Sequence, residues 1–187
     1  RVRHGAKMVR PTAKVKSISS RTYVRPIIGG ISVGHYAITA GTLGGIFIDK
    51  NGDIIMLSNN HVLTDSNYAR IGDQIYQPGP YDGGRSQVAR LKDYVKLSNN
   101  VDQDSAIAKL TTKYTAIING IGRIRGFGIA KLREVVQKSG RTTGITTGRI
   151  IATNGTFKVW YSDTKAYILR NCIVTNNMCQ GGDSGSL

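Results

Sequence analysis

The stretch GGDSGS at residues 181–186 holds a serine and an acid between glycines. The Ser184 hydroxyl is a weak nucleophile until a neighbouring base removes its proton. Attack on a carbonyl then creates an oxyanion, which backbone N–H groups stabilise if the chain turns sharply enough to aim them at one point. Gly182 and Gly185 permit such a turn, because glycine adopts positive φ without steric cost. We therefore predict nucleophilic chemistry at Ser184, with the amides of Gly182 and Ser184 forming an oxyanion hole.

A base for this serine must come from three histidines. His4 lies in a basic segment where nothing orients it, and His35 at the start of an expected strand could cap or pack there. His61 follows the strand-like run IIMLSNN, where a rigid element can hold a base at the edge of a cleft. His61 is therefore the candidate base, although a single histidine after a strand can also be purely structural.

An acid that orients the histidine is the third requirement of such a site. Asp102 and Asp104 in VDQDSAIAKL are two residues apart, so they would share one face of a strand. Asp104 leads directly into a small apolar run that is expected to be buried, and a buried carboxylate needs a partner such as a histidine N–H. Alternatively, either aspartate caps a turn.

Taken in order, SNNHVL, DSAIAKL and GDSGSL resemble the chymotrypsin-like (trypsin-like) serine peptidases. The sequence SGRTTGITTGRI is similar to a hairpin of their bacterial members. The run GGISVGHYAITAGTLGGIF is similar to a disulfide-poor bacterial-type subgroup and to the plant narrow-leaf type proteins. The resemblance covers residues 27–187. It implies an all-β fold of two antiparallel six-stranded β-barrels.

The resemblance also assigns roles by position. It implies that the chain is a serine endopeptidase that acts on proteins or peptides through an acyl-enzyme, without a cofactor or a metal. Asp104 is preferred to Asp102 because only Asp104 begins the family pattern of an acid followed by an apolar strand. The implied site residues are His61 as general base, Asp104 as its orienting acid, Ser184 as nucleophile, Gly182 as an oxyanion donor, and Asp183 and Gly185 as supports of the turn.

The elements that must position these residues read as short strands with frequent turn signals. The runs at 46–48 and 54–57 flank an Asn51-Gly52 pair and predict a hairpin. Residues 1–26 form a basic N-terminal segment, the basic arm. We expect a first barrel over 27–118, a connector over 119–132 and a second barrel over 133–187.

In the resembling family, further strands follow the nucleophile turn. We therefore expect the second barrel to be incomplete in this chain. One hypothesis is self-cleavage after Leu187, with the C-terminal fragment of the same polypeptide remaining bound as a separate chain. A truncated sequence is the alternative explanation.

The chain has 187 residues and a net charge of +15, and its first acid is Asp49. The basic arm could bind nucleic acid or another acidic partner, or it could simply be solvated. An alternative function is therefore a non-catalytic binding or regulatory module with a protease fold.

Cys172 and Cys179 are too few for a disulfide scaffold or a zinc site. No apolar run approaches the length of a membrane span. We expect no membrane contact and a possible homo-oligomer. Few cysteines slightly favour the cytoplasm, but the localisation stays open.

Overall fold

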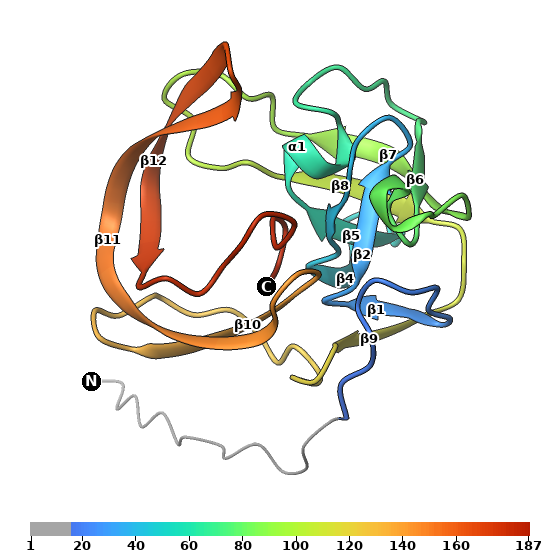
Figure 1. Cartoon of the computed structure of the whole chain (residues 1–187), viewed down its shortest axis with the longest axis horizontal. Coiled ribbons are helices and arrows are strands. Elements are labelled where there is room, and N and C mark those ends of the chain that lie inside the picture. Colours follow the sequence, from blue (N-terminus) through green and yellow to red (C-terminus); the bar gives the residue numbers. More distant parts are fainter. Residues whose placement is uncertain (1–15) are drawn as a thin grey trace.

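The computed structural model describes residues 16–187, and nearly all of its regular structure is β-strand (Figure 1). His4 and the basic residues before Lys16 therefore lie outside the described residues. The prediction of an all-β chain is confirmed. The strands are β1 (Ile27–Gly29), β2 (Ser32–His35), β3 (Gly41–Thr42), β4 (Gly45–Ile48), β5 (Ile54–Ser58), β6 (Gln74–Tyr76), β7 (Gln87–Tyr94), β8 (Ala106–Leu110), β9 (Tyr114–Ile118), β10 (Val135–Gly140), β11 (Gly144–Ser162) and β12 (Lys165–Thr175).

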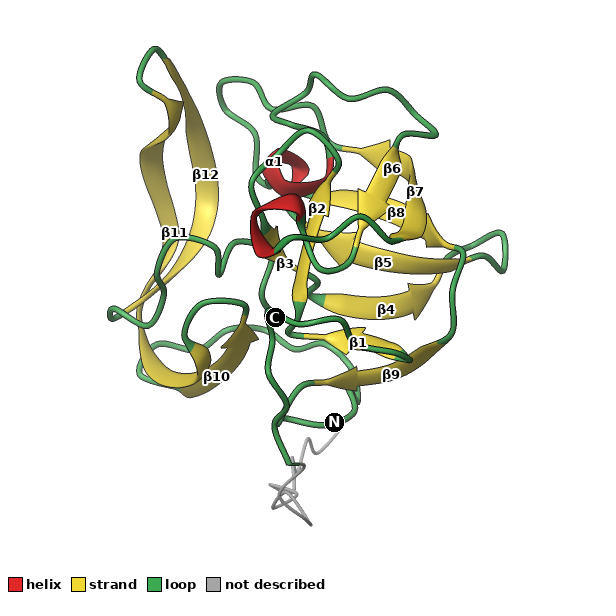
Figure 2. Ribbon diagram, turned by 45° about the vertical axis from the view of Figure 1, so that its right-hand side comes forward, coloured by secondary structure: helices red, strands yellow, loops and turns green. Residues whose placement is uncertain are grey.

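Seven of these strands form one curled antiparallel sheet in the order β3-β2-β6-β7-β8-β5-β4. The predicted hairpin is present as β4 and β5, in which Ile48 pairs with Ile54 across the Asn51-Gly52 turn. Gly52 adopts a φ of +81°, which glycine tolerates better than other residues. Figure 2 shows this sheet on the side of the molecule opposite β11 and β12.

Strands β1 and β9 form a separate two-stranded parallel sheet. The first half of the chain thus combines the curled antiparallel sheet with one parallel pair of strands. A parallel pair needs a long crossover connection, and the seven-stranded sheet supplies it between β1 and β9. The apolar core of this half comprises seventeen buried residues between Val24 and Ala108.

The second half contains a three-stranded antiparallel sheet in the order β10-β11-β12. β11 is 19 residues long, and several register shifts between β11 and β12 allow this long ribbon to bend. Figure 1 shows the ribbon curving around residues 176–187, which lie between it and the seven-stranded sheet. The expected connector, residues 119–132, carries no strand. The second sheet is not closed into a barrel, in agreement with the prediction that the second barrel is incomplete in this chain.

The described end of the basic arm, residues 16–26, lies against the body of the protein. Ile18 exchanges two hydrogen bonds with the Asn119 side chain, and the Ser20 hydroxyl donates to the Arg141 carbonyl. The Arg25 guanidinium donates to the side chains of Gln77 and Ser86. Part of the arm is thus docked rather than extended.

Two short helical turns complete the structure: α1 (Asn60–Leu63) and the 3₁₀ turn η1 (Pro80–Asp82). α1 directly follows β5 and contains His61. A single turn is too short to produce a helical sequence period, so no helix was predicted at these residues. No helix within residues 16–187 is long and apolar enough to span a bilayer.

Candidate active site

His61 lies in a helical turn that two asparagine side chains connect to other segments of the same chain. The Asn59 amide donates to the Asp104 carbonyl at 2.5 Å, and the Asn60 amide donates to the Val95 carbonyl at 2.7 Å. Asn60 is fully buried, and it also accepts a hydrogen bond from the Thr64 hydroxyl. The Asn-Asn-His sequence thus fixes the turn from which His61 projects. Sequence reasoning had assigned no role to these two asparagines.

Asp104, and not Asp102, lies beside His61. Asp104 Oδ2 is 2.5 Å from His61 Nδ1, and Oδ1 accepts a hydrogen bond from the His61 backbone N–H at 3.3 Å. Asp102 is exposed. An ionised carboxylate can only accept hydrogen bonds, so the imidazole hydrogen must be on Nδ1. This leaves Nε2 free to act as a base.

Tyr161, near the end of β11, is a third member of this cluster that sequence reasoning missed. Its hydroxyl donates to Asp104 Oδ2 at 3.1 Å, and its ring meets the His61 ring in an edge-on arrangement with centroids 5.5 Å apart. Burial raises the pKa of the Tyr161 hydroxyl, and the nearby Asp104 carboxylate raises it further. No motif in the sequence links Tyr161 to the aspartate, because the contact depends on the bend of β11.

Ser184 lies in a turn that contains two glycines with positive φ, +94° at Gly182 and +90° at Gly185. A side chain at Gly185 would collide with Ser58 Oγ and with the Thr42 carbonyl. Thr42 binds the turn at two points: its N–H donates to the Ser184 carbonyl at 2.8 Å, and its hydroxyl donates to the Gly182 carbonyl at 2.9 Å. Within residues 16–187, the N–H groups of Gly182 and Ser184 donate to no protein acceptor. Neither amide is therefore committed to a protein acceptor in this part of the chain.

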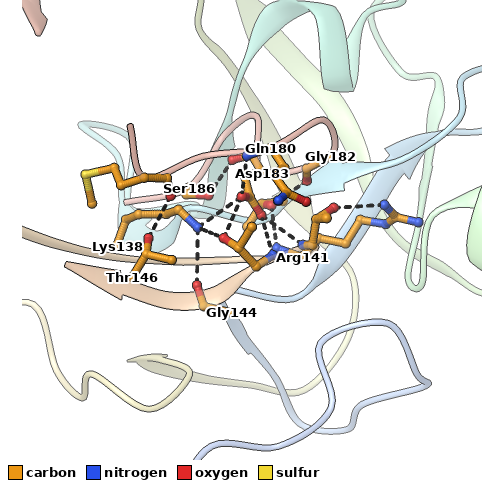
Figure 3. A network of polar contacts seen from close by, with 12 residues as sticks. Lys138, Arg141, Gly144, Thr146, Gln180, Gly182, Asp183 and Ser186 are labelled. Carbon is orange, nitrogen blue, oxygen red and sulfur yellow. Dashed lines mark hydrogen bonds and ion pairs between the residues drawn. The ribbon is translucent and has the colours of Figure 1, made fainter. Parts of the chain in front are cut away.

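Asp183 lies beneath this turn in a network of polar contacts (Figure 3). Its carboxylate accepts hydrogen bonds from the backbone of Thr142, Thr143 and Gln180, from the Thr143 hydroxyl and from Lys138 Nζ at 3.1 Å. Burial by itself raises the pKa of Asp183, but these hydrogen bonds outweigh it and lower the pKa to about 2. Asp183 is therefore ionised at neutral pH, and it fixes the shape of the turn.

Lys138 supplies the counter-charge for Asp183 from within the second sheet. Its side chain is 8% exposed, and its ammonium group also contacts the Thr143 hydroxyl and the Gly144 carbonyl. The sequence motif SGRTTG thus provides the threonine donors to Asp183 and the turn that the Lys138 ammonium group contacts. Lys138 was not among the predicted site residues.

His61, Asp104 and Ser184 line one cavity of about 610 Å³ between the two halves of the chain. The cavity is also lined by residues 37–40 from the first half and by Val159, Trp160, Tyr161 and Leu169 from β11 and β12. Within the described residues, no hydrogen bond joins His61 to Ser184, and catalytic hydrogen bonds are often long before a substrate binds. Of the six predicted site residues, His61, Asp104 and Ser184 line this cavity, and Gly182, Asp183 and Gly185 lie in the same turn as Ser184.

The other candidates lie elsewhere. His35 is buried, its Nε2 is 3.1 Å from Asp73, and its Nδ1 accepts a hydrogen bond from the Ala37 N–H. Both of its nitrogens are thus occupied within the fold. Cys172 and Cys179 form no disulfide. In the described part of the chain, no group of three His, Cys, Asp or Glu side chains is arranged to hold a metal ion.

Comparison with known proteins finds no matching family model and no matching curated protein. Solved structures do match. Nocardiopsis protease aligns with a TM-score of 0.62 and 20% identity, over 85% of this chain and 76% of its own. Thermobifida fusca protease A aligns with a TM-score of 0.60 and 18% identity, over 85% and 75% of the two chains. A glutamic-acid-specific serine protease, described as using a histidine triad in substrate binding, aligns with a TM-score of 0.58 and 21% identity, over 85% and 77%.

At this level of identity the alignments establish the fold. They agree with the strand pattern and with the resemblance noted in the sequence. The structural neighbours of this chain are chymotrypsin-like serine proteases of the bacterial type, and the chain has their fold.

Proposed function

We propose that this chain is a serine endopeptidase in which His61, Asp104 and Ser184 form the catalytic triad. The observation that carries the proposal is the cavity that these three side chains share, with His61 already oriented by Asp104. The free amides of Gly182 and Ser184 support the proposal, because an acyl-transfer site needs donors at the developing oxyanion.

The reaction follows from these positions. His61 Nε2 removes the proton from the Ser184 hydroxyl as Oγ attacks the carbonyl carbon of the peptide bond. The amides of Gly182 and Ser184 stabilise the oxyanion of the tetrahedral intermediate, and Asp104 stabilises the imidazolium. The C–N bond then breaks, and His61 gives its proton to the leaving amine. In the second half of the reaction, His61 accepts a proton from a water molecule as its oxygen attacks the ester carbon. The bond between Ser184 Oγ and the acyl carbon then breaks, His61 returns the proton to Oγ, and the acid product leaves.

A fluorophosphonate probe with intact-mass spectrometry tests this proposal directly, because the probe reacts only with an activated serine. We expect one probe mass on the wild-type chain and none on Ser184→Ala. Ser98→Ala, which changes an exposed serine, is the matched control and should label normally. His61→Ala should slow labelling by about 10²–10⁴-fold, the usual contribution of a general base.

A folded wild-type chain that takes no label would contradict the proposal. In that case the alternative is a protease-fold module that binds without catalysis, with the basic arm contacting nucleic acid or another acidic partner. Such binding would weaken steeply as salt is added, and deletion of residues 1–26 would abolish it.

Cleavage after Leu187 is a separate part of the proposal. In a polypeptide that continues beyond Leu187, Ser184 could cut the bond that follows Leu187 and leave the two fragments associated. The Ser184→Ala variant of such a polypeptide should stay uncut. If it is still cut at that bond, Ser184 is not the nucleophile of the cleavage.

A further inference from the structure

The Oδ2 atom of Asp104 receives two hydrogen bonds from different halves of the molecule. His61 Nδ1, on α1, is 2.5 Å away, and the Tyr161 hydroxyl, on β11, is 3.1 Å away. We propose that Tyr161 is a positioning residue that holds the Asp104 carboxylate in the orientation that His61 requires. This inference rests on the proposed peptidase function.

Asp104 needs such a partner because it is nearly buried. Its side chain is 9% exposed, so water cannot solvate most of its lone pairs. Within residues 16–187, its carboxylate accepts hydrogen bonds from the His61 N–H, from the His61 ring and from the Tyr161 hydroxyl. Both His61 donors lie on the side of α1. The Tyr161 hydroxyl is therefore the described donor that fixes the carboxylate from the side of β11.

The Tyr161 hydroxyl can play only one role towards Asp104. Burial and the Asp104 charge both raise its pKa, so the hydroxyl keeps its hydrogen over the pH range in which an imidazole base works. An ionised carboxylate accepts only, so the hydroxyl must donate. The other titratable groups near Tyr161 are His61, Tyr167 and Cys172.

A packing role is the competing explanation, because the Tyr161 ring also contacts other rings. It lies edge-on to His61, and it lies 5.7 Å from the Tyr167 ring. The Tyr161→Phe variant separates the two roles, since it removes the hydroxyl and retains both ring contacts. Tyr167→Phe is the matched control, because no hydrogen bond joins the Tyr167 hydroxyl to Asp104.

The first measurement is the rate of fluorophosphonate labelling as a function of pH. Tyr161→Phe should label about 10-fold more slowly than wild type near neutral pH, the order expected for one hydrogen bond to a charged group. With one donor fewer, Asp104 attracts the protonated imidazole more strongly. The acid limb of the rate profile should therefore move to higher pH. Tyr167→Phe should leave both the rate and the profile unchanged.

The second measurement does not depend on activity. The downfield proton resonance of His61 Nδ1–H, assigned by its absence from a His61→Gln variant, should shift in Tyr161→Phe and not in Tyr167→Phe. If the wild type labels but Tyr161→Phe matches it in rate, pH profile and resonance, Tyr161 only packs and the inference is wrong. If the wild type does not label, the peptidase proposal fails. An unchanged resonance then overturns the hydrogen-bonding role as well, whereas a shifted resonance supports it.

Discussion

The half of the chain that contains His61 and the half that contains Ser184 bury different kinds of side chain. The first half of the chain has a core of seventeen apolar residues, including fully buried Ile31, Leu43 and Met56. Among residues 119–187, the only buried apolar side chain is Ile150. The buried polar residues from Lys138 onward are Lys138, Ser139, Arg141 and Asp183. Figure 3 shows Lys138 and Arg141 beside Asp183 at the nucleophile turn.

The difference indicates how each half contributes to the site. Apolar burial is favourable in free energy but not directional, so it gives the first half a stable scaffold on which α1 presents His61. Hydrogen bonds contribute less net stability, but they fix angles and distances. The second half thus fixes the conformation of the turn at Ser184 through directional polar contacts rather than through an apolar core.

The largest expected effect comes from removing the charge at the polar centre of the second half. Asp183→Asn leaves the Lys138 ammonium buried without a counter-charge, and it replaces an acceptor of the threonine hydrogen bonds with a donor. We expect unfolding to become easier by about 3–5 kcal/mol. Fluorophosphonate labelling should be lost. Asp163→Asn changes an exposed aspartate in the turn between β11 and β12, and it should have little effect on either measurement.

The same variant tests the acid sensitivity of the turn. The pKa of Asp183 is lowered to about 2 in the fold, whereas an unfolded aspartate titrates near about 3.9. The stability that its ionised form contributes is therefore complete above the unfolded value and is lost as the pH falls towards 2. Urea titrations between neutral and acid pH should show this loss in the wild type and a smaller loss in Asp183→Asn. Equal acid sensitivity of the two proteins would contradict the assignment.

The sequence was sufficient for the parts of the site that depend on local structure. Ser184 and its glycines form a turn within six residues, and the Asn51-Gly52 hairpin needs only its own two strands. Asp104 was preferred to Asp102 because only Asp104 begins the pattern of the resembling family, an acid followed by an apolar strand. In each case a short pattern determines the local geometry.

The sequence was not sufficient where a contact joins the two halves. Tyr161 reaches Asp104 through the bend of a 19-residue strand, and register shifts set that bend. Lys138 reads as a polar residue of a half-exposed strand, yet it is buried against Asp183. The parallel pairing of β1 with β9 also depends on how the whole first sheet curls. These are properties of the assembled fold that no local pattern carries.

A pair of identical substitutions sharpens the contrast between the two sheets. Ile75 in β6 is fully buried, whereas Ile151 in β11 is 55% exposed. Ile75→Ala should lower the free energy of unfolding by about 2–5 kcal/mol, because it removes apolar contacts and leaves a cavity. Ile151→Ala should cost less than about 1 kcal/mol, the range of strand propensity alone. Urea denaturation followed by tyrosine fluorescence measures both. Similar costs would mean that the second sheet has an apolar core of its own.

A smaller effect than that of Ile75→Ala is expected at the joint between the two halves. The Arg141 guanidinium, in the turn after β10, donates to both carboxylate oxygens of Asp82 in η1 at 2.7 and 2.6 Å, and both side chains are buried. Arg141→Lys keeps the charge but loses the planar, two-point contact, so we expect a cost of about 1–2 kcal/mol. Arg125→Lys, at an exposed arginine of the connector, should cost almost nothing.

The same variant tests whether the joint positions the nucleophile turn. The backbone N–H of Arg141 donates to the Thr42 hydroxyl, and that hydroxyl donates to the Gly182 carbonyl. Labelling of Ser184 should therefore slow in the Arg141 variant and not in the Arg125 variant. Equal labelling rates in the two variants would mean that the joint stabilises the chain without positioning the nucleophile turn.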